Sequence, residues 1–313
     1  MAGEARAGLL EVPEATVTSR VGAWIEGLRP RTLAAGVAPV LVGTAAADAF
    51  VPWRFGAALV VALGLQIGVN LANDLHDGVR GVDTPERAGP QRLVASGAAS
   101  PRAVRAAALA AIAVAALAGL ALAAATTWWL LAVGAVAILA LWLYSGGPRP
   151  YAGLGLGEVM VFVFFGLVAT AGSAFVQDGA VLAPAWWGGA SMGLLAVAIL
   201  VANNLRDIPT DAVAGKRTLA VRIGAPRTRA FYRWCMAIAF ALVPVGVFVG
   251  FVRPELGTEQ WSLVALPAWI FAIRPMERVA TAEGRELIPV LVATSLTQLV
   301  FGALLAIGLW AAP

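Results

Sequence analysis

Apolar residues in this chain fall into long runs, separated by short segments rich in arginine, glycine and proline. A helix that crosses the hydrocarbon core of a bilayer needs about 20 predominantly apolar residues. By this measure we predict nine spans, with borders placed to within several residues. They lie at residues 31–50, 54–75, 101–122, 126–145, 156–177, 186–206, 227–251, 260–278 and 287–311. The pattern therefore predicts an all-α integral membrane protein.

The composition supports the same class of protein. Of the 313 residues, 60% are hydrophobic and 13% are charged, whereas soluble domains have roughly 45–50% apolar and about 25% charged residues. No linker rich in proline or serine divides the chain. We therefore expect a polar N-terminal tail over residues 1–25, without the apolar core of a signal peptide, and one transmembrane domain over residues 26–313.

Basic residues are distributed unevenly between the two ends of the predicted spans. If the N-terminus is inside, the inside segments hold 20 of the 22 lysines and arginines, and the outside segments hold only Arg54 and Arg253. Cytoplasmic loops carry an excess of positive charge, so we predict a cell-membrane protein with a cytoplasmic N-terminus and an outside C-terminus. This asymmetry explains a pI near 10.0 better than nucleic-acid binding does. The single Cys235 excludes an internal disulfide, and the single His76 leaves little for a zinc or haem site.

The second predicted span ends in the acidic sequence Asn70-Leu-Ala-Asn-Asp-Leu-His-Asp77. In a helix, residues three or four apart share a face. Those that share this face are Gln66, Asn70, Asn73, Asp74 and Asp77. Acids are disfavoured at a helix C-terminus, so their presence indicates a bound cation, and hard oxygen ligands suit Mg²⁺ bridged to a phosphate. Asp83 follows in the loop as a further candidate, and His76 points to another face.

The sixth predicted span ends in a similar sequence, Asn203-Asn-Leu-Arg-Asp-Ile-Pro-Thr-Asp211. The offset from Asn70 to Asn203 equals that from Asp74 to Asp207, which indicates two repeated halves at about residues 31–150 and 156–285 and one shared site. Pro209 is expected to stop the helix, so that Asp207 ends the span and Asp211 returns on a turn. Lys216 and Arg217 follow, and they suit the phosphate oxygens of a metal diphosphate.

A third segment, Tyr144-Ser-Gly-Gly-Pro-Arg-Pro-Tyr151, joins the fourth and fifth spans. Its glycines allow a close backbone approach, and Tyr144 with Arg149 could contact a phosphate or an acceptor. A plain tight turn fits the same residues equally well. Glu158 opens the fifth span, where a carboxylate is favourable either as a cap or as a ligand.

These motifs together resemble the UbiA family of intramembrane prenyltransferases, and within it the branch that prenylates 1,4-dihydroxy-2-naphthoate. Asn70 to Asp83 is similar to the family's first Asp-rich motif, and Asn203 to Asp211, with Gly215-Lys-Arg-Thr-Leu219, is similar to the second. Asp83 follows Asp77 by six residues instead of the commoner four, a spacing that fits the naphthoate branch. Gly89-Pro-Gln-Arg92 resembles the loop of that branch. The resemblance covers nearly the whole chain.

The resemblance implies nine transmembrane helices around a central cavity, with the Asp-rich loops forming a cytoplasmic cap. It also implies a transferase that uses two Mg²⁺ ions and joins a polyprenyl group from a prenyl diphosphate to 1,4-dihydroxy-2-naphthoate. Pyrophosphate and CO2 would be lost, giving demethylmenaquinol for menaquinone biosynthesis.

The site residues are assigned by group. The metal-binding candidates are Asn70, Asp74, Asp77, Asn203, Asp207 and Asp211, of which the four aspartates are catalytic. The diphosphate-binding candidates are Arg80, Lys216 and Arg217. The acceptor-binding candidates are Gln91, Arg92, Tyr144 and Arg149. Additional candidates are Gln66, Asn73, Asp83 and Glu158.

Two other functions are compatible with parts of this pattern. A UbiA-type enzyme could use another aromatic acceptor, such as 4-hydroxybenzoate or homogentisate. A transporter could use repeated acidic helix ends to bind a coupling ion. The acids here cluster at cytoplasmic helix ends beside lysine and arginine, and no charged residue lies mid-span in the outer half, so the sequence favours the enzyme.

The charge asymmetry predicts which membrane face carries the acidic motifs. In a Cys235→Ser background, a cysteine at Gly215 should react with an impermeant thiol reagent only from the cytoplasmic side. A cysteine at Gly179 should react only from the opposite side. Labelling of intact and inverted membrane vesicles measures this, and the reversed pattern would overturn the predicted orientation.

Overall fold

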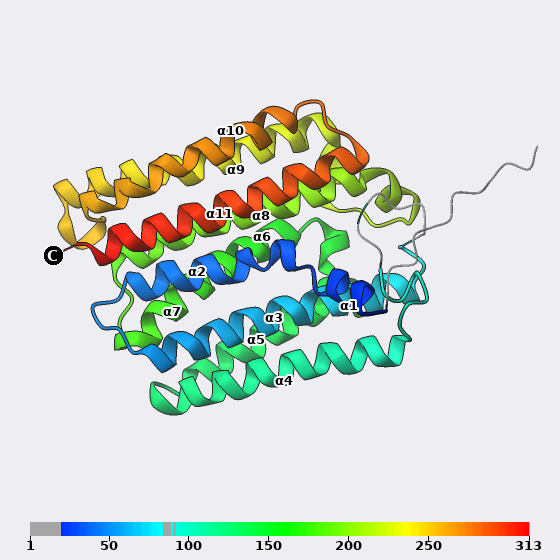
Figure 1. Cartoon of the computed structure of the whole chain (residues 1–313), viewed down its shortest axis with the longest axis horizontal. Helices are drawn as coiled ribbons and strands as arrows, with labels where there is room; N and C mark the ends of the chain where they lie inside the picture. Colours follow the sequence, from blue (N-terminus) through cyan, green and yellow to red (C-terminus); the bar gives the residue numbers. More distant parts are fainter. Residues whose placement is uncertain (1–19, 84–88, 90–91, 313) are drawn as a thin grey trace, which may run out of the picture.

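The computed structural model of the chain describes residues 20–83, 89 and 92–312, and every regular element within them is helical (Figure 1). The longer α-helices are α3 (Pro52–Val79), α4 (Pro101–Ala125), α8 (Ala183–Val213), α9 (Leu219–Val252) and α11 (Leu287–Trp310). The shorter ones are α1 (Arg20–Leu28), α2 (Ala34–Ala45), α5 (Trp129–Ser145), α6 (Gly157–Val161), α7 (Ala169–Asp178) and α10 (Trp269–Arg278). A π-helical segment, η3 (Phe162–Val168), joins α6 to α7, and the short elements are η1 (Pro30–Thr32), η2 (Tyr151–Leu154), η4 (Pro254–Leu256), η5 (Gln260–Ala268) and η6 (Gly284–Glu286).

Six helical segments of the described chain are long and apolar enough to cross a bilayer, which confirms an integral membrane protein. They are Pro52–Val79, Pro101–Ala125, Gly157–Asp178, Ala183–Val213, Leu219–Val252 and Gly284–Trp310. The other three predicted spans coincide with shorter helices: α2, α5, and the pair η5 and α10. α2 is short because Arg29 and Pro30 interrupt the helix before it and because it ends at Ala45, before the predicted border at residue 50.

The helices pack side by side in one bundle (Figure 1). α3 packs against α4 and α5, whereas α8 packs against α9, α11 and η3. α2 contacts α3, α7, α8 and α11, so it connects the two groups. α8 is the central helix, because 72% of its most apolar stretch is buried inside the protein, against 28% for α4. The largest apolar core accordingly surrounds α8.

α8 does not end where the sequence predicted. The helix passes through Pro209 and continues to Val213, so the expectation that Asp207 ends the span and Asp211 returns on a turn is wrong. Pro209 is exposed, and Thr210 Oγ1 donates to the carbonyl of Asp207 at 3.1 Å. A proline is tolerated inside a membrane helix although it removes one backbone N–H, here the one that would bond the carbonyl of Leu205. Asn203, Asp207 and Asp211 are therefore spaced four apart on one helix face.

Apolar side chains on the outside of the bundle are widely exposed. Leu117 of α4, Trp129 of α5 and Phe248 of α9 are 68%, 79% and 67% exposed. Such a surface would be unfavourable in water and matches lipid chains. These helices therefore present their outer faces to the bilayer.

Candidate functional site

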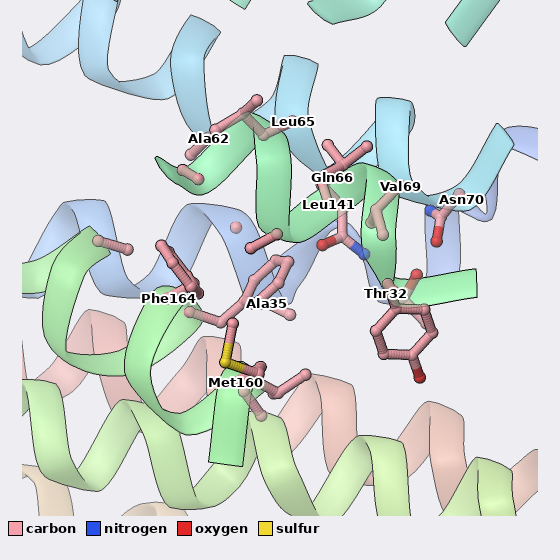
Figure 2. A pocket seen from close by; sticks show the side chains of 18 of the residues that line it. Thr32, Ala35, Ala62, Leu65, Gln66, Val69, Asn70, Leu141, Met160 and Phe164 are labelled. Atoms are coloured by element: carbon pink, nitrogen blue, oxygen red, sulfur yellow. The ribbon is translucent and has the colours of Figure 1, made fainter. Parts of the chain in front are cut away.

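A cavity of about 330 Å³ lies between the two groups of helices, and its polar and apolar side chains are separated (Figure 2). The polar lining gathers near the C-terminal ends of α3 and α8. The apolar lining comes from α2, α3, α4, α5 and the α6–η3–α7 segment, and includes Leu65, Val69, Leu141, Met160 and Phe164. The cavity can therefore hold a molecule with a charged head and an apolar body.

The first acidic motif contributes a stripe along α3. Gln66, Asn70, Asn73 and Asp77 all line the cavity, as their helical spacing predicted. Asn70 also donates from Nδ2 to the carbonyl of Leu28 at 3.2 Å, which ties α3 to the end of α1. The sequence therefore located this face correctly for these four residues.

Asp74 has a different position from its neighbours in the motif. It does not line the cavity and is 1% exposed. Its Oδ2 accepts from the backbone N–H of Leu93 at 2.8 Å, and its Oδ1 accepts from that of Val94 at 2.9 Å. In this structure the Asp74 carboxylate holds the loop that follows α3.

Side-chain packing reinforces this loop contact. Leu93 is 1% exposed and packs with Leu71 and Leu75 of α3. A Cβ on Gly27 would lie 2.6 Å from Leu93 Cδ1, and a Cβ on Gly78 would lie 2.7 Å from Val94 Cβ. The loop therefore fits closely against both α1 and α3 because glycines leave room for it.

Asp77 joins the two halves of the chain. Its Oδ2 lies 2.9 Å from Lys216 Nζ, which belongs to the loop between α8 and α9. Burial acts to lower the pKa of Lys216, but the carboxylates of Asp77, Asp211 and Asp83 outweigh it and raise this pKa above its ordinary value. Lys216 therefore remains a cation over the physiological pH range.

Asp207 is held by an arginine that the sequence analysis did not place in the site. Arg206 Nε lies 2.7 Å from Asp207 Oδ1, and its Nη2 lies 2.8 Å from Oδ2, a two-point contact. The same Nη2 donates to Asn203 Oδ1 at 2.7 Å. A Cβ on Gly89 would lie 3.0 Å from this nitrogen. The loop after α3 therefore approaches Arg206 closely, and Asn203, Asp207 and Asp211 line the cavity beside it.

Of the other predicted site residues, most of those that the structure describes lie outside the cavity lining and two belong to it. Arg80 donates to the carbonyls of Ser145 and Gly147, and so holds the chain after α5. Arg149 and Arg217 are exposed. Asp83 pairs with Arg92 Nε at 3.2 Å, and Glu158 accepts from Asn204 Nδ2 at 3.0 Å. Arg92 and Tyr144 do line the cavity, whereas Gln91 lies outside the described residues.

Five polar lining residues were not among the site candidates from the sequence, namely Arg29, Thr32, Tyr151, Ser173 and Asn204. Arg29 has φ 54° and ψ 59°, the only positive φ among the non-glycine residues that the structure describes. Non-glycine residues rarely adopt this region, and strained residues often occur at functional sites. The interruption by Arg29-Pro-Arg-Thr32 before an apolar run was the available signal.

His76 belongs to a network behind the cavity wall. Its Nδ1 lies 3.3 Å from Ser145 Oγ, which donates to Asn73 Oδ1 at 2.7 Å. Its ring also packs edge-on against Trp142. His76 therefore joins α3 to α5 and fixes the orientation of Asn73, consistent with its predicted position on another helix face.

The lining supplies the ligands that a hard divalent cation prefers. Asp77, Asp207 and Asp211 bring carboxylates from two helices to one space. Asn73 and Asn203 also line it, with amide oxygens that accept from Ser145 and Arg206. Among the described residues, no three His, Cys, Asp or Glu side chains are close enough to form a complete metal site. Mg²⁺ commonly binds through one or two carboxylates, waters and substrate phosphates, so this donor set fits Mg²⁺ accompanied by a phosphate ligand.

Comparison with known proteins agrees with this geometry. Residues 36–274 match the sequence profile of the UbiA prenyltransferase family. The chain belongs to this family. It is 47% identical over 290 residues to a Mycobacterium tuberculosis protein named 1,4-dihydroxy-2-naphthoate octaprenyltransferase, with 90% of this chain and 95% of that protein covered. An Escherichia coli protein of the same name is 37% identical over 298 residues, covering 92% and 93%.

Solved structures of UbiA homologues share the fold. The structure of a homologue from Archaeoglobus fulgidus bound to GPP and Mg²⁺ has a TM-score of 0.62 and 17% identity, and covers 92% of this chain and 99% of that one. The apo structure of a homologue from Aeropyrum pernix K1 has a TM-score of 0.69 and 18% identity, and covers 88% and 97%. At these identities the likeness establishes the fold.

The contacts of Asp74 predict a structural role that can be measured. Asp74→Ala should leave the buried N–H groups of Leu93 and Val94 without an acceptor and destabilise the fold by about 1–3 kcal/mol. Hydrogen exchange should then accelerate at these two amides. Asp77→Ala is the matched comparison and should leave both amides protected, because its carboxylate contacts Lys216. Unchanged protection in Asp74→Ala would contradict the assigned contact.

Proposed function

We propose that this UbiA prenyltransferase transfers a polyprenyl group from a prenyl diphosphate to 1,4-dihydroxy-2-naphthoate, with loss of pyrophosphate and CO2, in the formation of demethylmenaquinol. The observation that carries the proposal is the cavity, in which acidic and basic groups meet at one end and an apolar space adjoins them. The naming of relatives at 47% and 37% identity supports the choice of acceptor.

The polar end suits the diphosphate. We assign Asp77 from α3, together with Asp207 and Asp211 from α8, to the binding of Mg²⁺, with two ions as in our expectation from the sequence. Asn70, Asn73 and Asn203 line the same space and contribute neutral oxygen atoms. When bound, Mg²⁺ neutralises charge on the departing pyrophosphate and so assists ionisation of the allylic C–O bond. Asp74 takes a positioning role in this proposal, because both of its oxygens hold the loop after α3.

One basic side chain of the cavity lining would change partners when the diphosphate enters. Lys216 pairs with Asp77 at 2.9 Å, whereas Arg206, which holds Asp207 at 2.7 Å, does not line the cavity. A metal diphosphate presents phosphate oxygens to the cations while its metal takes the carboxylates, so each buried charge keeps an opposite charge nearby. Arg29 and Arg92 line the same end and add positive charge. Arg80 and Arg217, which do not line the cavity, are expected to contribute less.

The apolar walls protect the reactive cation from water. The allylic C–O bond breaks and its electron pair leaves with pyrophosphate. Phe164 and Phe165 from η3, with Leu65 and Leu141, leave the cation few polar neighbours until the ring attacks. The new C–C bond forms at the ring carbon that bears the carboxylate. The bond to the carboxylate then breaks, its electron pair returns to the ring, and CO2 leaves.

The location of the site in the membrane follows from the same proposal. Six long helices and the shorter segments α2, α5 and η5–α10 provide nine crossings, with the loops after α3 and α8 as a cap over the polar end. The positive charge of these loops orients that end toward the cytoplasm. An anionic acceptor is then drawn to the basic mouth, where Arg92, Arg29 and Tyr144 are available to its carboxylate.

Loss of a carboxylate should abolish turnover. Asp77→Ala, Asp207→Ala and Asp211→Ala should each lower kcat by at least about 100-fold, because the developing charge on pyrophosphate loses its metal. EDTA should have the same effect on the unmodified protein, and added Mg²⁺ should restore activity. Asp48→Ala, at the opposite end of the bundle, serves as the control and should retain activity. Full activity in EDTA would exclude the mechanism.

The choice of acceptor is tested by carbon balance. Liposomes containing the protein, Mg²⁺ and a prenyl diphosphate should convert 1,4-dihydroxy-2-naphthoate in strong preference to 4-hydroxybenzoate. With carboxyl-labelled acceptor, one labelled CO2 should be released for each prenyl group transferred. A product that retains the carboxylate, or a preference for 4-hydroxybenzoate, would show that the family chemistry is present with a different acceptor.

A further inference from the structure

The apolar part of the cavity contains the polar side chain of Gln66, and Ser173 of α7 also lines it. Gln66 precedes Asn70 by one turn of α3 and lies about 16 Å along the helix axis from Asp77. Figure 2 shows its amide projecting from α3 into the cavity, whose lining also includes Leu65, Val69, Leu141 and Ala35. Gln66 is 6% exposed, and its Oε1 has no hydrogen-bond partner among the described residues.

An unpaired buried amide is unfavourable in the protein alone. Leaving such a group without a partner costs about 1–3 kcal/mol, whereas an apolar residue of similar shape would avoid that cost. Buried polar groups in native proteins are nearly always paired, so an exception that faces a cavity indicates a partner supplied from outside. The partner of Gln66 must be a group that enters the cavity.

The chemistry of the two substrates identifies the hydrogen-bond partner of Gln66. This step rests on the proposed function. A prenyl diphosphate has a strongly charged head and a hydrocarbon tail, which has no hydrogen-bonding atom. Its head matches the ionic end near Asp77, Asp211 and Lys216, and its tail matches the apolar walls. The aromatic acceptor, by contrast, carries neutral hydroxyl groups. A neutral amide can accept from a hydroxyl through Oε1 and donate to it through Nε2.

The orientation of the acceptor selects one of its hydroxyls. The acceptor carboxylate is drawn to the basic mouth, where Arg29, Arg92 and Lys216 line the cavity. The 1-hydroxyl is ortho to that carboxylate and the 4-hydroxyl is meta to it, so the 4-hydroxyl is the one of the two that lies farther from the mouth and extends toward the apolar interior. We propose that Gln66 is a specificity-determining residue that hydrogen-bonds the 4-hydroxyl of the acceptor inside the cavity.

If Gln66 binds the 4-hydroxyl, its replacement should change KM for the acceptor and leave two other constants unchanged. In liposomes containing the full chain, Gln66→Met should raise KM for 1,4-dihydroxy-2-naphthoate about tenfold, the effect of losing one well-placed hydrogen bond. KM for the prenyl diphosphate should be unchanged. The inhibition constant of 1-hydroxy-2-naphthoate, which lacks the 4-hydroxyl and competes with the acceptor, should also be unchanged. The thermal midpoint should be equal or higher, because the substitution removes an unpaired amide.

Gln298→Met is the matched control. Gln298 is also a buried glutamine with an unpartnered Oε1, but it lies on α11 outside the cavity lining and donates to the carbonyl of Met192 at 3.0 Å. The Gln298→Met substitution should leave both KM values and the inhibition constant unchanged. Gln66→Leu provides a second apolar variant if Gln66→Met fails to fold, and it should give the same separation of constants.

Three results would overturn the proposal. An unchanged KM for the acceptor would mean that the amide has no role in its binding. A raised KM for the prenyl diphosphate would assign the amide to that substrate. An equal rise in KM and in the inhibition constant of 1-hydroxy-2-naphthoate would indicate a change in cavity shape. Failure of the unmodified protein to prenylate the naphthoate is a separate result, and it would refute the proposed function itself.

Discussion

Charged side chains inside an apolar bundle are stable only when each has an opposite charge or a hydrogen-bonding partner, and this constraint organises the polar end of the protein. Asp77 is 5% exposed and pairs with Lys216, while Asp207 is 3% exposed and pairs with Arg206. Asp77 and Lys216 are 139 residues apart in sequence, so this ion pair joins α3 to the loop after α8. The Asp77 carboxylate therefore joins the two halves, whereas Asp207 is paired within α8 by its neighbour Arg206.

The constraint also explains why the loop after α3 is so firmly attached. A loop that covers charged groups must satisfy its own buried backbone groups. Asp74 supplies acceptors for two of its N–H groups, and Leu93 places an apolar side chain against α3. Neighbouring aspartates of one motif consequently have different functions: Asp74 positions the loop, and Asp77 faces the space beneath it.

Much of this arrangement could be predicted from the sequence, and the exceptions have physical causes. Long apolar runs and helical spacing predicted the bundle and the cavity-facing stripe from Gln66 to Asp77. They could not predict that the Asp74 carboxylate, at the edge of the stripe, accepts from the backbone N–H groups of Leu93 and Val94, because this depends on where the loop after α3 lies. Pro209 was interpreted from its local effect on a helix, whereas α8 continues through it to Val213 with the proline on the exposed side. Arg206 was interpreted only as one of the positive charges on the inside face. The sequence does not reveal that its side chain turns back to pair with the adjacent Asp207.

The separation of polar and apolar surfaces within one cavity limits how two substrates can be arranged. In the proposed reaction, the diphosphate is favoured beside the cations and carboxylates at the mouth, which would place the reactive allylic carbon just below them, at the level where the walls become apolar. An aromatic acid shares the attraction to the mouth through its carboxylate, which places its carboxylate-bearing carbon near that allylic carbon. In our proposal, the neutral amide of Gln66 deeper in the cavity stabilises a hydroxyl without competing for the diphosphate, because an anion gains more from Lys216, Arg29 and Arg92 at the mouth. The cavity can therefore orient both molecules through differences in charge alone, and the shape of its apolar walls is left to determine how the prenyl chain fits.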